Sequence, residues 1–164
     1  MVKVIMGPKG TGKTKQMIDL INTAVETEHG NVVAIAHDSK LTFDINYKIR
    51  LVETSDYDIP NYDTLKGFLY GLYASNYDIT HVFIDSLNKL VSTENKADVE
   101  AFLDWLEASP QKGGTKYTAS ISEAEPPARE GVRKYFKYIK PGGPSADALG
   151  PFVYQTLDAA GAGC

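Results

Sequence analysis

The sequence predicts an α/β fold: a three-layer sandwich around a mostly parallel sheet of about five strands. Short apolar runs rich in β-branched residues alternate with segments whose apolar residues recur every three or four positions. Connections long enough for a helix are the kind that join parallel strands. The chain has 164 residues, of which 43% are hydrophobic and 23% charged. These values are typical of one globular domain and exclude a disordered chain, a collagen-like repeat and a coiled-coil rod.

Five segments have the composition of strands. Most are nearly continuous apolar runs, as expected for strands that are covered on both faces, and turn-forming residues bound them. The predicted strands are residues 2–6, 31–36, 49–53, 80–84 and 116–122.

Four segments have the periodicity or the start signals of helices. Gly30 stops the first of them, and Pro127 is tolerated in the first turn of the last. The predicted helices are residues 13–29, a helix through 65–73 that Asn61 or Asp63 caps, 98–108 and 127–138.

The segment between the first strand and the first helix fits the pattern G-x-x-x-x-G-K-[ST] at every defined position. It consists of Gly7, Pro8, Lys9, Gly10, Thr11, Gly12, Lys13 and Thr14. Glycines let the backbone N–H groups of such a loop converge on phosphates, and the helix N-terminus adds partial positive charge. We expect Lys13 to reach the β- and γ-phosphates and the Thr14 hydroxyl to bind Mg²⁺. The pattern therefore predicts a binding site for a nucleoside triphosphate.

Asp85 follows the predicted strand at residues 80–84, so it belongs at the carboxyl edge of the sheet. Ligands bind at that edge in open α/β sheets. We expect Asp85 to act with Lys13 in catalysis and to contact Mg²⁺ together with Thr14, directly or through water. The structural alternative is an aspartate that caps the turn after the strand.

With these two motifs the chain resembles the P-loop NTPases over roughly residues 1–138. Within them it is most similar to small clostridial-type ATP-binding proteins that are often labelled twitching-motility ATPases. The segments that carry this resemblance are VKVIMGPKGTGKTKQMIDLIN, LTFDINYKIRLVETSDYDI, NYDITHVFIDSLNKL and SISEAE with REGVRKYF. The resemblance implies a P-loop nucleotide-binding domain over residues 1–139 that binds ATP.

Hydrolysis needs a group that orients water and often an arginine that neutralises developing charge. Many P-loop ATPases place a glutamate directly after the strand-end aspartate, and here that residue is Ser86. Each remaining candidate also has a structural interpretation as a turn, cap or solvated residue. The candidate bases are Asp38, Glu123 and Glu125, the candidate γ-phosphate sensors are Ser120 and Ser122, and the arginines are Arg50, Arg129 and Arg133.

We therefore expect a nucleoside triphosphate-binding protein with weak or partner-regulated, Mg²⁺-dependent hydrolysis. The absence of a glutamate at position 86 favours slow turnover. One alternative is a small-molecule kinase that transfers the γ-phosphate, with Asp38 as its base. The other is a non-catalytic module whose interactions depend on the bound nucleotide.

Charge and composition limit the classes of partner and the location that we expect. The net charge is −4, and residues 51–110 carry 11 acidic but only 3 basic side chains, which argues against nucleic acid. No apolar run approaches a membrane span, and Cys164 is the only cysteine, so we expect a cytoplasmic protein. A protein partner or a homo-oligomer stays open. Residues 140–164, rich in Pro, Gly and Ala, are interpreted as a disordered tail, a docking arm or an artificial extension.

Overall fold

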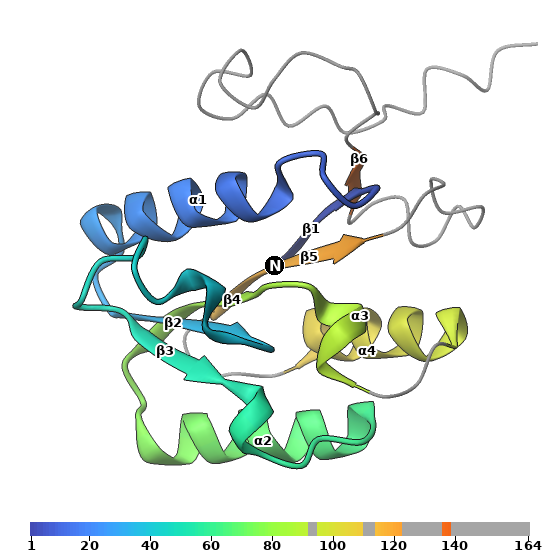
Figure 1. Cartoon of the computed structure of the whole chain (residues 1–164). Helices are drawn as coiled ribbons and strands as arrows, with labels where there is room; N and C mark the ends of the chain where they lie inside the picture. Colours follow the sequence, from blue (N-terminus) through green and yellow to red (C-terminus); the bar gives the residue numbers. More distant parts are fainter. Residues whose placement is uncertain (92–94, 110–113, 123–135, 139–164) are drawn as a thin grey trace, which may run out of the picture.

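The protein has one parallel sheet, as the sequence predicts (Figure 1). The computed structural model describes residues 1–91, 95–109, 114–122 and 136–138. In these residues the strand order is β3-β2-β4-β5-β1-β6, and every neighbouring pair is parallel. The strands are β1 (Val2–Gly7), β2 (Asn31–Ala36), β3 (Arg50–Glu53), β4 (Ile79–Ile84), β5 (Lys116–Ser122) and β6 (Phe136–Tyr138).

The sixth strand corrects the prediction of a helix over residues 127–138. Phe136–Tyr138 forms β6, which pairs with β1 so that Phe136 lies opposite Val4. Backbone groups on the outer edge of β1 need hydrogen-bond partners, and this long-range pairing outweighs the local helical pattern. The rest of that predicted helix and the segment 140–164 lie outside the described residues.

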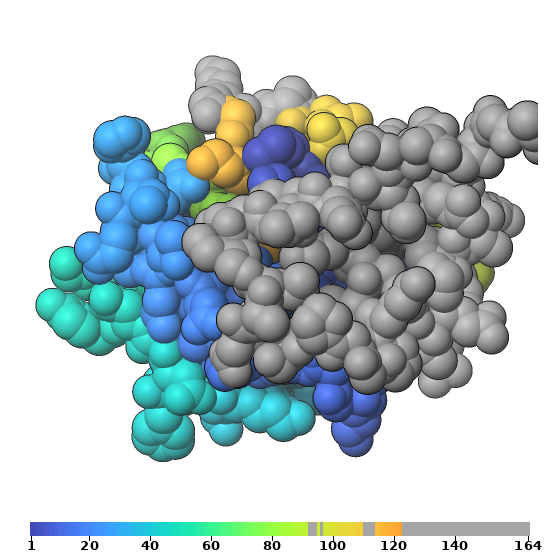
Figure 2. Space-filling model, turned by 90° about the horizontal axis from the view of Figure 1, so that it is seen from above, coloured from blue at the N-terminus to red at the C-terminus, as the bar shows by residue number. Residues whose placement is uncertain are grey.

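Helices cover both faces of the sheet and make the three layers. One face carries α1 (Lys13–Thr27), and the other carries α2 (Tyr62–Ser75), α3 (Leu87–Leu90) and α4 (Lys96–Ala108) (Figure 1). Figure 2 looks onto the α1 side, where the blue side chains of α1 form part of the surface. The short helices η1 (Ser39–Leu41) and η2 (Thr54–Asp56) follow β2 and β3.

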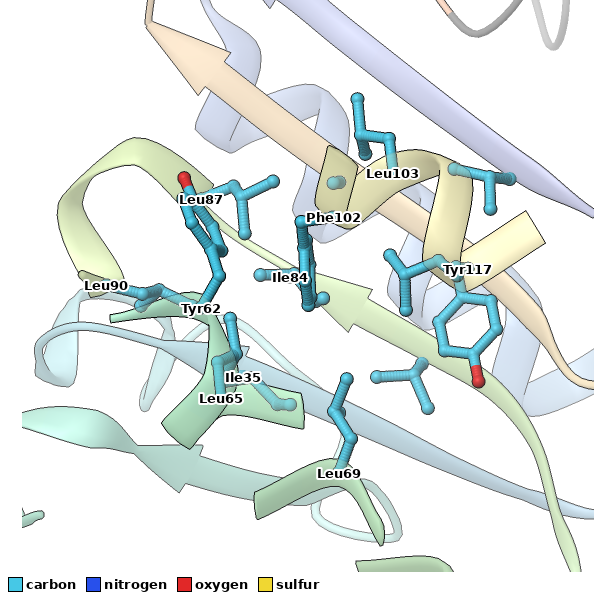
Figure 3. Close-up of a cluster of buried hydrophobic side chains, with 14 of the residues drawn as sticks. Ile35, Tyr62, Leu65, Leu69, Ile84, Leu87, Leu90, Phe102, Leu103 and Tyr117 are labelled. Carbon is cyan, nitrogen blue, oxygen red and sulfur yellow. The ribbon is translucent and has the colours of Figure 1, made fainter. Parts of the chain in front are cut away.

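Two apolar clusters, one on each face of the sheet, explain why most strand sequences are nearly continuous apolar runs. On the α1 side, Met17 and Ile21 are fully buried against Ala34 and Phe83 of the sheet. The larger cluster on the other side joins α2, α3 and α4 to alternate residues of the same strands (Figure 3). A parallel sheet that is covered on both faces favours apolar residues at most positions of its strands.

Local signals set the ends of the longer helices. Asn61 caps α2, where its side chain accepts the Thr64 N–H at 2.9 Å, and Asn95 caps α4 by accepting the Ala97 N–H at 3.0 Å. Side-chain caps of this kind satisfy backbone N–H groups that the helix leaves free. No helix among the described residues combines the length and the apolar character needed to cross a membrane.

The register of the sheet brings three strand ends together at its carboxyl edge. β5 lies between β1 and β4, with Ser122 opposite Gly7 and Ala119 opposite Ile84. The residues that follow these strands therefore start from neighbouring points, which is what a ligand site at this edge requires.

Candidate functional site

The loop between β1 and α1 needs its glycines for conformational reasons. Gly10 and Gly12 have φ angles of 85° and 82°, in the left-handed region that other residues rarely adopt. Gly12 is also the N-cap residue of α1, so the loop leads straight into the N-terminus of that helix (Figure 1). Helix N–H groups and the helix dipole favour an anion at this point.

Lys13 is folded under the loop rather than extended into solvent. Its side chain is buried, and Nζ donates to the Pro8 carbonyl at 2.6 Å. The Thr11 hydroxyl donates to the same carbonyl at 2.7 Å, so Pro8 organises both side chains. Burial lowers the pKa of Lys13, while the charge of Asp85 raises it and that of Lys89 lowers it further. Because burial disfavours the charged form of this ammonium group, a nearby anion would stabilise that form.

Asp85 is buried at the end of β4 and is held by hydrogen bonds on several sides. Its N–H donates to the Ile35 carbonyl at 2.8 Å, which extends the β2–β4 ladder by one residue. The Ser120 hydroxyl donates to Asp85 Oδ1 at 2.8 Å. The position of the carboxylate is thus set by the two strands that flank β4.

The loop and the strand ends enclose a cleft of about 290 Å³. Four lysines and two aspartates line it, whereas the whole chain has a net charge of −4. A concave site with an excess of lysines in an acidic protein attracts anions. The lining residues are Lys9, Gly10, Gly12, Lys13, Thr14, His37, Asp38, Lys40, Asp85, Ser86, Lys89 and Ser122.

The cleft contains many of the candidate site residues that the sequence predicts. Within the predicted loop, Gly7 ends β1, while Pro8 and Thr11 brace Lys13 and do not line the cleft. Ser120 is 1% exposed and lies behind Asp85, so its hydroxyl binds the carboxylate instead of facing the cleft.

Of the candidate arginines and glutamates, only Arg50 belongs to the described residues. Arg50 lines a different cavity, next to Asn31 and Ile79 at the starts of β2 and β4. Arg50 therefore does not line the cleft. Glu123, Glu125, Arg129 and Arg133 lie outside the described residues.

Asp38 lies in the cleft but is poorly suited to be a base. Burial raises its pKa, but hydrogen bonds from Lys40 and the Lys40 charge outweigh this and hold the pKa below its usual range. Lys40 Nζ lies 3.2 Å from Asp38 Oδ2. A carboxylate with a lowered pKa accepts protons less readily than a free one.

Sequence reasoning missed three lining residues: His37, Lys40 and Lys89. Lys89 comes from α3, a helix of four residues that periodicity cannot detect. The available signal was its position four residues after Asp85, on the segment that starts at the ligand edge of the sheet.

The residues present suit Mg²⁺ bound with a nucleotide. Thr14 and Asp85 bring a hydroxyl and a carboxylate to one cleft, and Mg²⁺ prefers one or two protein oxygens completed by phosphates and waters. Among the described residues no group of three or more His, Cys, Asp and Glu side chains forms a metal cage. The cleft therefore has the donors expected for a metal that arrives with its phosphates.

Comparison with known proteins gives little beyond these observations. No family model matches the chain, and no curated protein matches it. Among solved structures it is similar to the flagellar accessory protein FlaH from Methanocaldococcus jannaschii, with 17% sequence identity and a TM-score of 0.49. That match covers 77% of this chain and 63% of FlaH. The β1–loop–α1 unit, with Asp85 one strand away across β5, is consistent with the predicted P-loop NTPase fold.

Proposed function

We propose that the chain binds a nucleoside triphosphate, ATP, with Mg²⁺ in the cleft at the carboxyl edge of the sheet. The observation that carries this is the shared lining of the cleft by Lys13, Thr14 and Asp85, directly at the N-terminus of α1. Loop amides and Lys13 would bind the phosphates. Thr14 and Asp85 would hold Mg²⁺, which supplies charge neutralisation to the phosphate oxygens when bound.

We further propose that the protein alone hydrolyses ATP slowly. Ser86 stands where many relatives of this fold place a glutamate, and its hydroxyl is 3.5 Å from Asp85 Oδ2. A serine hydroxyl is a weak base, and Asp38 is held as an ion pair with Lys40. In the described part of the chain no arginine lines the cleft. Since the lack of an arginine finger alone costs about 10³–10⁵ in rate, we expect about one turnover per minute or less.

The test is product analysis with ATP labelled on the γ-phosphate, at saturating Mg²⁺. Slow release of phosphate that Lys13→Ala abolishes supports the proposal. Transfer of the label to an added acceptor would identify a kinase instead, and tight binding without either product would identify a nucleotide-dependent module. Turnover above about 1 per second, within the usual enzyme range, would contradict slow hydrolysis.

A further inference from the structure

The four-residue helix α3 is anchored firmly beside the cleft. Its two leucines, Leu87 and Leu90, are buried in the larger apolar cluster (Figure 3). The preceding Ser86 has a φ of 52°, and its N–H donates to Ser120 Oγ at 2.7 Å. A serine in this left-handed conformation is strained, so it persists only because its surroundings hold it there.

A second contact fixes α3 to β5. The side-chain amide of Asn88 donates to the Ser122 carbonyl at 3.2 Å, and Asn88 Oδ1 accepts the Ser122 N–H at 3.2 Å. Both leucines are buried and Asn88 is hydrogen-bonded to β5, so Lys89 is the exposed side chain of α3. Its backbone is therefore fixed, and only its flexible stem is free to adjust.

Lys89 shares the cleft with Lys13 but comes from a different element. Lys13 begins α1, whereas Lys89 follows β4 and lines the cleft beside Asp85 and Ser86. Lys13 and Lys89 thus line a cleft that has more lysines than aspartates among its described residues, and a bound polyanion would relieve their repulsion.

The other cleft lysine near β2 is already neutralised by a partner. Lys40 forms its ion pair with Asp38, whereas Lys89 makes no ion pair with any residue in the described ranges. A phosphate held by the loop amides would lie at the N-terminus of α1. Because Lys89 follows β4 rather than the loop, we infer that it would contact a phosphate that projects beyond the loop toward Asp85.

We propose that Lys89 binds the terminal phosphate of a nucleoside triphosphate and distinguishes the triphosphate from the diphosphate. This rests on the proposed function, because it assigns a role within the same cleft. Lys89 would supply the positive charge near the terminal phosphate for which the sequence analysis considered an arginine. A diphosphate, which ends within reach of the loop and Lys13, gains little from it.

The test compares Lys89→Gln with Lys89→Arg, and uses Lys48→Gln as a control for the loss of one positive charge far from the cleft. Lys48 is exposed and lines the cavity that also contains Arg50. Titration calorimetry with Mg²⁺ measures the affinity for a non-hydrolysable ATP analogue and for ADP. We expect Lys89→Gln to weaken the triphosphate analogue at least about tenfold and ADP less than about twofold. Lys89→Arg should restore the preference, and Lys48→Gln should leave both affinities unchanged.

Equal losses for both nucleotides, no loss, or the same loss in Lys48→Gln would overturn the role of Lys89. If Lys13→Ala still abolished binding, the proposed function would survive that result. If the unmodified protein bound neither nucleotide, the proposed function itself would fail and this assignment with it. Because Lys89 is exposed, its variants should keep the unmodified melting temperature, which confirms that any change in affinity arises at the site.

Discussion

Ser120 and Asp85 are joined across neighbouring strands by a hydrogen bond of 2.8 Å, in which the Ser120 hydroxyl donates to Asp85 Oδ1. The same hydroxyl oxygen accepts the Ser86 N–H at 2.7 Å. One buried serine on β5 therefore fixes both the strand-end carboxylate and the strained residue after it. The cleft owes its geometry to this central strand as much as to the glycine loop.

Ser120→Ala should destabilise the fold and weaken the site together. The substitution leaves the Asp85 carboxylate and the Ser86 N–H without their partner in a buried place, which costs about 1–3 kcal/mol. Urea unfolding measures the loss. Ser122→Ala is the matched control, because the described contacts of Ser122 to Asn88 use only its backbone. Equal stabilities of the two variants would show that the Ser120 hydroxyl holds nothing in place.

Thr14→Ala and Asp85→Asn should each reduce the contribution of Mg²⁺ to nucleotide binding. Both residues line the cleft, and each substitution removes a proposed Mg²⁺ ligand or its charge. The measurement is nucleotide affinity with Mg²⁺ and with a chelator, for each variant and for the unmodified protein. We expect a large change with Mg²⁺ and a small one without it. If Asp85→Asn changed only the melting temperature, Asp85 would be a structural cap.

Protonation of His81 should destabilise the protein below neutral pH. His81 Nδ1 lies 3.3 Å from Glu28 Oε1, and Nε2 lies 2.9 Å from Thr118 Oγ1, in a partly buried site between α1 and the sheet. Burial lowers the pKa of His81 to about 4; Glu28 opposes the shift, while Lys116 and Lys3 add to it. The unfolded chain, with a His pKa of about 6.5, then binds more protons between these values. Stability therefore falls as the pH drops from about 6.5 to about 4, by up to about 3 kcal/mol.

Urea unfolding at about pH 7 and about pH 4.5 measures this effect in the unmodified protein and in His81→Gln. The variant should lose much less stability on acidification. His29→Gln is the control, since His29 is an exposed histidine at the end of α1 and should keep the full pH dependence. Identical pH dependence in His81→Gln and the unmodified protein would show that His81 is not the responsible group.

The parts of the fold that local sequence determines could be predicted. Neighbouring residues predicted β1, the loop and α1. The signals were two glycines that adopt the left-handed conformation, a β-branched run before them and an amphipathic helix after them. The Asn61 cap of α2 and the strand before Asp85 are local signals of the same kind. Because parallel strands end at one edge, the meeting of Asp38, Asp85 and Ser122 with the loop also followed from the pattern.

The remaining features depend on contacts between distant segments. Phe136–Tyr138 became a strand because β1 had a free edge, which no local pattern reports. The helix α3 follows Ser86, whose left-handed conformation is stabilised by the hydrogen bond from its N–H to Ser120. Lys89 of this helix lines the cleft. Arg50 was nominated by residue type alone, and its strand begins at the opposite edge of the sheet.

The most direct test of the account is calorimetric titration of ATP with Mg²⁺ into the unmodified protein and into Lys13→Ala. Lys13 is the buried cation braced by Pro8 at the start of α1, and a charge-assisted contact to phosphate is worth about 1.5–3 kcal/mol. We predict that Lys13→Ala binds at least about tenfold more weakly, while Lys48→Ala, far from the cleft, binds as the unmodified protein does. Equal affinities of the unmodified protein and Lys13→Ala, or no binding by either, would contradict the assignment of this cleft to a nucleoside triphosphate.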